Sequence, residues 1–262
     1  MNKLHFDYWM ELSFTEPVAE THYTIKCLPK DTDLQRISEI KIKIEPENEF
    51  QQGEDSFGNA QIYGCVRETH QKFGFQISGI SQTGLALGEQ KQEGEFAGKY
   101  LYPYGLNRSG AGIQEYFQSI ILNPEKSAYE NGICLMNRLY QDFIYEKEVT
   151  NVTTTAEEAW QQRKGVCQDY AHILIALCHL AKIPARYVAG MMVGEGFSHA
   201  WVEVLSDDVW YGLDPTNGCI AGDTYIKIAV GRDAGDCMIN KGIMKGGGTQ
   251  TQEVVVRVEE QS

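Results

Sequence analysis

A run of mostly apolar residues that begins at Cys167 constrains the fold more than any other feature of the chain. The run is about fourteen residues long and follows a glycine break at Gly165, a pattern typical of a helix with a defined start. Because the run is mostly apolar, we expect this helix to be buried in the core. Cys167 then lies in the first turn, where backbone N–H groups and the positive end of the helix dipole favour a thiolate.

Two further residues suited to acyl transfer follow, each at the edge of a strand-like run. His199 begins the run 199–205, and Asp214 ends the run 209–214. A short turn between the runs leaves about six residues on either side, which brings His199 and Asp214 to the same end of an antiparallel hairpin. There His199 can pair with the Cys167 thiolate and protonate a leaving amine, while Asp214 fixes the tautomer of the imidazole.

Each of these residues has an ordinary structural explanation when it is taken alone. The glycine break, the shared hairpin end and the order Cys, His, Asp together favour an activated-thiol site made of Cys167, His199 and Asp214. The candidate donors to an oxyanion are the backbone N–H of Cys167 and a side-chain amide, Gln161 or Gln168.

The sequence predicts no metal and no cofactor. His172, Cys178 and His179 lie on the cysteine helix, and the two histidines share one face because they are seven residues apart. Core packing or a buried hydrogen bond explains them better than zinc, because the chain has no HExxH motif and no paired CxxC.

The first hundred residues have the pattern of half-buried strands. Apolar and polar residues alternate through 23–27, 40–44 and 73–77, with turn clusters between them. This spacing predicts a small β-sandwich. We interpret four residues scattered through it as pleat or surface residues rather than as a site: His5, His22, Cys65 and His70.

The period changes after a glycine-rich segment at 84–98, which we interpret as a hinge. Ser127 and Thr155 each begin a Ser/Thr-x-x-Glu capping box, which predicts helix starts near 128 and 156. Five strand-like runs follow the cysteine helix: 186–193, 199–205, 209–214, 225–230 and 253–258. The second half is therefore α+β, with helices first and an antiparallel sheet after. We expect two domains, a β-rich one at 1–99 and a catalytic one at 100–262.

Composition limits the partners and the compartment. The chain has 36 acidic and 23 basic residues, a net charge of −13 and no dense basic cluster, so we expect no nucleic-acid partner and no membrane partner. The first nine residues carry charge where a signal peptide would be apolar, and no run approaches the roughly twenty apolar residues of a membrane span. We expect a cytoplasmic protein whose seven irregularly spaced cysteines are reduced. The oligomeric state is left open.

The residues around the three candidates resemble the core of the transglutaminase-like superfamily, a papain-like cysteine-enzyme fold whose bacterial members are often called putative cysteine proteases. The resemblance covers residues 160 to 218 and rests on four motifs in order: Gly165-Val166-Cys167, Ile183-Pro184-Ala185-Arg186-Tyr187-Val188, Ser198-His199-Ala200-Trp201-Val202-Glu203 and Trp210-Tyr211-Gly212-Leu213-Asp214-Pro215-Thr216. It implies that Cys167 is the nucleophile, His199 the base and Asp214 the orienting acid.

The resemblance extends beyond this core, with two departures. The first hundred residues resemble the N-terminal domain of bacterial members, and 229–233 resembles a segment after the family's aspartate. The stretch 234–238 lacks the aromatic residue and the prolines of that pattern. The chain also has no acidic loop like the calcium sites of animal transglutaminases, so the resemblance does not imply calcium activation.

We therefore predict a cysteine-dependent amide hydrolase, a protease or peptidase that acts on a peptide or protein amide through a thioester. Two alternatives stay open: amine transfer to the same thioester, as in a transglutaminase, and a non-catalytic scaffold or binding module. Amine transfer requires a channel that excludes water. The tryptophans near the motifs, Trp160, Trp201 and Trp210, are as easily core residues as the walls of such a channel.

Overall fold

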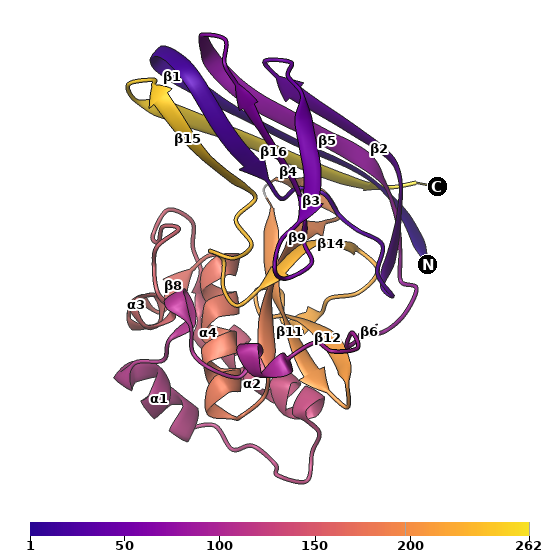
Figure 1. Ribbon diagram of the computed structural model, residues 1–262. Coiled ribbons are helices and arrows are strands. Elements are labelled where there is room, and N and C mark those ends of the chain that lie inside the picture. Colours follow the sequence, from indigo (N-terminus) through magenta and orange to yellow (C-terminus); the bar gives the residue numbers. More distant parts are fainter. Residues whose placement is uncertain (197, 262) are drawn as a thin grey trace.

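The structure is a computed structural model that describes residues 1–196 and 198–261. Figure 1 shows a part made of long strands above a part in which helices pack against a second sheet. Within the described residues the strands form an eight-stranded sheet, a six-stranded sheet and a two-stranded parallel pair. The predicted order, an all-β region followed by an α+β core, is confirmed.

The first sheet is organised around β1 (Asn2–Ile25), whose side chains alternate between buried and more exposed positions. Leu4, Phe6 and Met10 are fully buried on its inner face, as the period-two pattern requires. β1 pairs with β5 along one edge and with β16 along the other. The other strands of this sheet are β2 (Gln35–Glu45), β3 (Phe50–Glu54), β4 (Ala60–Val66), β5 (His70–Thr83), β10 (Gly194–Gly196), β15 (Asn240–Gly246) and β16 (Gln250–Glu260).

The last strands of the chain differ from the sequence prediction, because they belong to this first sheet. The expected strand 253–258 lies in β16, which pairs with β1 so that Tyr8 is opposite Val256, and β15 pairs with the end of β1. The expected catalytic domain, 100–262, therefore includes residues 240–260, whose strands belong to the first sheet and not to the catalytic part. Alternation predicts a half-buried strand but not the sheet edge with which it pairs.

The second part consists of helices packed on an antiparallel sheet in the order β13-β12-β11-β9-β14, with β6 also paired to β12. Its strands are β6 (Glu89–Gln90), β9 (Ala185–Met192), β11 (His199–Ser206), β12 (Val209–Asp214), β13 (Cys219–Ile220) and β14 (Tyr225–Gly231), and the parallel pair is β7 (Ile144–Tyr145) and β8 (Lys164–Gly165). The helices are α1 (Ala111–Gln118), α2 (Ala128–Asp142), α3 (Ala156–Gln162) and α4 (Cys167–Leu180), with short 3-10 turns at Ala97–Tyr100 and Gly105–Asn107. No helix among the described residues is long and apolar enough to cross a membrane.

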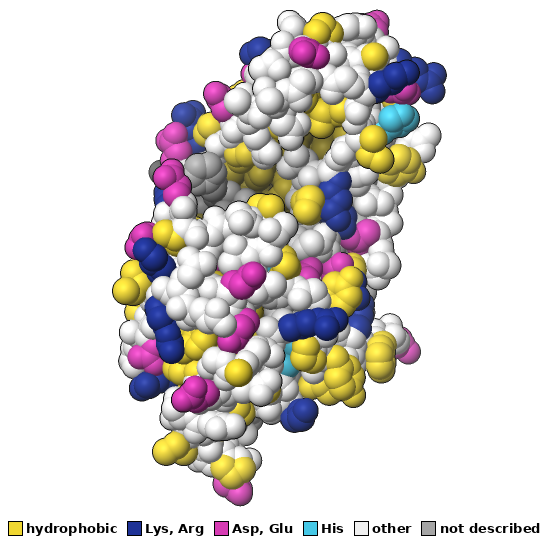
Figure 2. All heavy atoms as spheres, turned by 90° about the vertical axis from the view of Figure 1, so that its left-hand side faces the viewer, with side chains coloured by type: hydrophobic (Ala, Val, Ile, Leu, Met, Phe, Trp, Pro, Cys, Tyr) yellow, Lys and Arg dark blue, Asp and Glu magenta, His cyan; other side chains and the backbone are white. Residues whose placement is uncertain are grey.

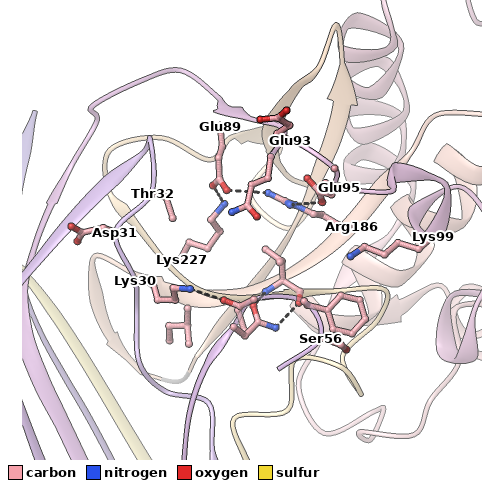
Figure 3. A pocket seen from close by; sticks show the side chains of 18 residues that line it. Lys30, Asp31, Thr32, Ser56, Glu89, Glu93, Glu95, Lys99, Arg186 and Lys227 are labelled. Carbon is pink, nitrogen blue, oxygen red and sulfur yellow. Dashed lines mark hydrogen bonds and ion pairs between the residues drawn. The ribbon is translucent and has the colours of Figure 1, made fainter. Parts of the chain in front are cut away.

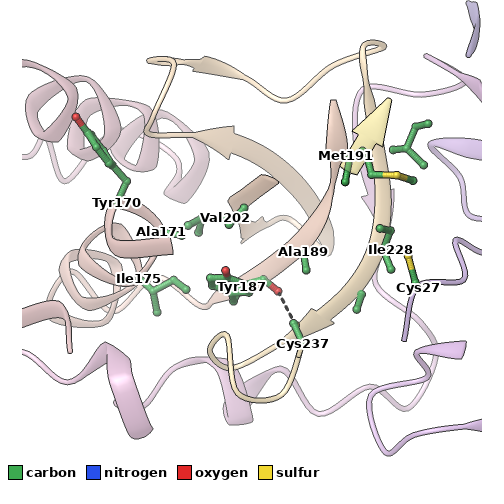
Figure 4. Close-up of a cluster of buried hydrophobic side chains, with 14 of the residues drawn as sticks. Cys27, Tyr170, Ala171, Ile175, Tyr187, Ala189, Met191, Val202, Ile228 and Cys237 are labelled. Carbon is green, nitrogen blue, oxygen red and sulfur yellow. Dashed lines mark hydrogen bonds between the residues drawn. The ribbon is translucent and has the colours of Figure 1, made fainter. Parts of the chain in front are cut away.

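The predicted helix starts and the buried cysteine helix are confirmed. Ser127 and Thr155 cap α2 and α3 through complete capping boxes. α4 begins at Cys167 and is buried along almost its whole length. Figure 4 shows how Ala171 and Ile175 of α4 face Tyr187 of β9 within the core. This core continues into the first sheet, so the two parts share one hydrophobic cluster.

The segment 84–98, which we interpreted as a hinge, is held against the second sheet by a buried network of ion pairs (Figure 3). Glu203 on β11 is 1% exposed, and it accepts from Arg186 Nε at 2.7 Å and from Lys227 Nζ at 3.0 Å. Glu89 contacts both cations, and Glu95 lies 3.5 Å from Arg186. Burial alone would raise the pKa of Glu203, but Lys227 and Arg186 lower it, so the carboxylate stays charged.

The change Glu203→Gln is expected to lower the free energy of unfolding by about 3–5 kcal/mol, because it leaves two buried cations short of their central anion. Urea denaturation of the purified variant measures this. Glu195→Gln is the matched control, since Glu195 pairs with Arg257 on the surface, and its expected cost is within about 1 kcal/mol. Equal costs for the two variants would contradict a stabilising role of the network.

Candidate active site

The structure brings the three predicted residues together from three element ends. Cys167 begins α4, His199 begins β11 and Asp214 ends β12. β11 and β12 form a hairpin through Asp207 and Asp208, which both have positive φ, as a tight two-residue turn requires. The hairpin register therefore carries His199 and Asp214 to the same end, and His199 Nε2 lies 2.7 Å from Asp214 Oδ2.

His199 lies between the thiol and the carboxylate. Because Asp214 engages Nε2, the remaining ring nitrogen, Nδ1, is the one available to Cys167. Burial works to lower the pKa of His199, but the hydrogen bonds to Asp214 and Cys167 outweigh it and raise the pKa to about 9. An imidazole with this pKa is cationic at neutral pH and can serve as a proton donor.

Asp214 is fully buried and accepts hydrogen bonds at both oxygens. Oδ2 accepts from His199, from Asn217 Nδ2 at 2.7 Å and from the Tyr225 hydroxyl at 2.8 Å, while Oδ1 accepts from the N–H groups of Thr216 and Asn217. Burial would raise the pKa of Asp214, but the hydrogen bond and charge of His199, with further hydrogen bonds from Asn217 and Tyr225, lower it. The aspartate is therefore ionised and fixed in position.

Sequence reasoning missed Asn217 and Tyr225. The Asp-Pro-Thr-Asn turn could have suggested the backbone N–H bonds to Asp214, since an aspartate side chain often binds the N–H groups that follow it. No local signal identifies Tyr225, because it reaches Asp214 only through the packing of β14 in the sheet.

A glycine and a buried acid set the start of α4. The Asp169 carboxylate accepts from the Val166 N–H at 2.8 Å and from the Thr150 hydroxyl at 2.6 Å. The Asp169 side chain packs so closely against Gly165 that a Cβ on Gly165 would lie 2.5 Å from Asp169 Oδ2. Position 165 therefore requires glycine. The hydrogen bond from the Val166 N–H to Asp169 caps the helix one residue before Cys167.

The two glutamines named as oxyanion donors lie in different places. Gln161 is on α3, where its amide donates to Glu157 at 3.3 Å, and it does not belong to the described residues that line the cavity at Cys167. Gln168 does line that cavity and donates to the Val152 carbonyl at 3.4 Å. The unpaired N–H groups of the first turn of α4, starting with Cys167, are therefore better placed than Gln161 to bind an oxyanion.

A cavity of about 520 Å³ lies at Cys167 and His199, between the two parts of the molecule. Figure 2 shows a recess containing hydrophobic side chains between the upper and lower parts of this face. Tyr8 of β1 and Val254 of β16 line the cavity from the first sheet, opposite Tyr187 of β9. Ser198, the residue before His199, lines the same cavity as Tyr8. The first sheet thus forms a wall of the candidate site.

The segment after β14 forms another wall. Ala234, Gly235, Met238 and Ile239 all line the cavity, so the stretch that departs from the family pattern still borders the site. The N–H of Ala234 donates to His172 Nε2 at 3.1 Å, which anchors the segment to α4. Burial lowers the pKa of His172 to about 3, so this histidine is neutral, and the buried hydrogen bond predicted for it is present.

All seven cysteines are free of disulfides. Of these, only Cys167 lies beside the hydrogen-bonded pair of His199 and Asp214. Among the described residues lining the cavity, Cys167 and Cys237 carry thiols. Burial raises the pKa of Cys237 well above its usual range, which disfavours its thiolate. Cys167 is therefore the candidate nucleophile of this site.

Comparison with known proteins agrees with this architecture. Residues 115–215 match the model of the transglutaminase-like superfamily, and residues 4–81 match the model of the bacterial transglutaminase-like N-terminal region. A crystal structure of a putative cysteine protease from Cytophaga hutchinsonii has a TM-score of 0.81 and 21% sequence identity, and the match covers 100% of this chain and 91% of that one. It shows that the two proteins share the whole fold.

Relatives in mycobacteria are similar in sequence. An uncharacterized protein of Mycobacterium leprae is 37% identical over 124 residues, which span 44% of this chain and 44% of that protein. An uncharacterized protein of Mycobacterium tuberculosis (strain ATCC 25618 / H37Rv) is 26% identical over a match that covers 89% of this chain and 85% of the relative. With matches to both the N-terminal and the core models, the chain belongs to the transglutaminase-like superfamily.

Proposed function

We propose that this protein is a cysteine-dependent amide hydrolase, a protease or peptidase acting on peptide or protein amides. The observation that carries the proposal is the placement of His199 between Cys167 and the buried Asp214. An aspartate held by five hydrogen bonds keeps the imidazole oriented. This is the arrangement that activated-thiol acyl transfer needs.

The proposed reaction has two stages. The Cys167 thiolate attacks the amide carbonyl, the oxyanion is bound by N–H groups at the start of α4, and His199 gives its proton to the leaving amine as the C–N bond breaks. This leaves a thioester on Cys167 and a neutral His199. His199 then takes a proton from water, the hydroxide attacks the thioester, and the acid leaves as the Cys167 thiolate and protonated His199 are restored.

Hydrolysis is favoured over amine transfer by the positions of the tryptophans. Trp201 is 3% exposed and packs against Tyr225, Trp160 stacks on Tyr116, and Trp210 is fully buried. No tryptophan belongs to the described residues that line the cavity at Cys167. A water-excluding channel of indole rings is therefore not built from these residues, and we expect water to reach the thioester.

The partition of the acyl-enzyme tests this proposal. With a panel of peptide amides and a large excess of ethylamine, we expect the free acid to dominate and the acyl-ethylamide to be minor, as measured by mass spectrometry. Cys167→Ala serves as the control for uncatalysed aminolysis. Predominant acyl-ethylamide would favour the transglutaminase alternative. No product, combined with no preferential labelling of Cys167 by limiting iodoacetamide at mildly acidic pH, would favour the scaffold.

A further inference from the structure

Three side chains with metal-binding atoms meet on the first sheet, away from the candidate active site. Glu20 and His22 are two residues apart on β1 and thus on the same face. Cys65 on β4 is directly opposite His22 in the antiparallel register. Sequence reasoning treated His22 and Cys65 as unrelated pleat or surface residues, because only the strand pairing brings them together.

The distances between the three ligand atoms fit a tetrahedral metal site. His22 Nε2 lies 3.1 Å from Glu20 Oε1, Cys65 Sγ lies 3.6 Å from Glu20 Oε1, and Cys65 Sγ lies 3.8 Å from His22 Nε2. Zinc bonds of ordinary length at tetrahedral angles place such atoms about 3.4–3.6 Å apart. Side-chain shifts of a few tenths of an ångström would therefore bring the three ligand atoms to these spacings.

We propose that Glu20, His22 and Cys65 bind a zinc ion on the outer face of the first sheet. The three ligands leave one coordination position, which solvent can fill because the His22 and Glu20 side chains are 60% and 40% exposed. His22 and Cys65 also border a hollow shared with Tyr23, Asn48 and Glu49, which is separate from the cavity at Cys167. The site therefore does not depend on the proposed hydrolase function.

The chemistry of the ligand set selects the class of metal. A thiolate and an imidazole suit zinc and similar transition metals, whereas calcium and magnesium prefer oxygen ligands. On binding, the Cys65 thiol gives its proton to solvent, so the thiolate and the Glu20 carboxylate together balance the two positive charges of the ion. Because the ligands come from β1 and β4, the ion would join these two strands.

Cobalt and zinc titrations of the Cys167→Ala variant test the proposal. The Cys167→Ala change removes the thiol beside His199, so metal binding at the candidate active site does not interfere with the titration. We expect one cobalt ion per chain, with a thiolate-to-cobalt charge-transfer band in the near ultraviolet and the intense visible bands of tetrahedral cobalt. Zinc is expected to displace the cobalt and to raise the midpoint of thermal unfolding.

Replacement of each ligand should weaken this binding. Adding Cys65→Ser should abolish the charge-transfer band and weaken zinc at least about 100-fold, since even outer-shell changes cost about 10–100-fold. Adding His22→Ala should weaken zinc comparably. The matched control is Cys219→Ser, which removes an exposed thiol whose polar neighbour is a tyrosine and should leave binding unchanged. Far-ultraviolet circular dichroism verifies that each variant is folded.

Two results would overturn the zinc site. One is the absence of stoichiometric cobalt or zinc binding at micromolar metal in the folded Cys167→Ala variant. The other is binding that persists at full strength after Cys65→Ser or His22→Ala.

Discussion

Replacing Cys167 with alanine is expected to abolish acyl-enzyme formation and to lower turnover by about 10⁶-fold, the scale seen when the nucleophile of a triad is removed. No other thiol can substitute, because Cys237, which also lines the cavity, is buried and its pKa is raised. His199→Ala should cost nearly as much, since it removes both the cation that favours the thiolate and the donor to the leaving amine. Single-turnover mass spectrometry of the intact protein measures the acyl-enzyme.

The matched control for this prediction is Cys219→Ser, an exposed thiol that is not among the described residues lining the cavity. It should retain the turnover of the parent protein. Turnover by a folded Cys167→Ala variant at the parent rate would remove Cys167 from the role of nucleophile. Loss of turnover in Cys219→Ser would instead show that turnover depends on the Cys219 thiol itself or on its contact with Tyr225.

Asp214→Asn is expected to lower turnover by about 10²–10⁴-fold while leaving some activity, because orientation and charge stabilisation of the imidazole are lost but the thiol and imidazole remain. It should also change the pH profile. In the parent protein the pKa of His199 is raised to about 9, so activity that needs the protonated imidazole should fall as pH rises through about 9. Without the Asp214 charge the pKa of His199 drops, and the alkaline limb of kcat/KM should move to lower pH.

The same shift has a consequence for stability. A histidine whose pKa is higher in the folded state than its ordinary value of 6.5 contributes stability that is fully present below pH 6.5 and is lost as pH rises through about 9. The parent protein should therefore lose part of its free energy of unfolding across this window. Asp214→Asn should show a weaker loss across the same window, as measured by urea denaturation at several pH values.

Tyr225→Phe is the control for Asp214→Asn. It removes one of the donors to Asp214 but keeps the carboxylate and its bond to His199. One net hydrogen bond is worth about 1 kcal/mol, so we expect turnover within about tenfold of the parent and an alkaline limb that stays near 9. Because an asparagine amide would face donors at this buried position, thermal unfolding must confirm that Asp214→Asn is folded during the assay. Equal activity of Asp214→Asn and the parent would exclude Asp214 from catalysis.

Local sequence was enough to predict the parts of the site that depend on one element and its neighbours. The glycine break and the apolar run defined the start of α4 at Cys167, because a helix cap and an apolar sequence pattern are local properties. The hairpin register followed from the position of a two-residue turn, which sets pairing by geometry alone. The hairpin alone therefore places His199 and Asp214 at the same end of β11 and β12, without the help of any tertiary contact.

Only the tertiary structure decided how the two parts of the chain combine. Strand alternation determined that 253–258 is a half-buried strand, but pairing with β1 depends on which edge is open in the folded molecule. The same long-range pairing makes Tyr8 and Val254 a wall of the cavity at Cys167, brings Tyr225 to Asp214 and gathers Glu20, His22 and Cys65. The sequence by itself thus determined the starts of α2, α3 and α4 and the hairpin of β11 and β12, because these depend on neighbouring residues. The cavity and the proposed zinc site were decided by sheet pairing between residues far apart in the chain, which no local period encodes.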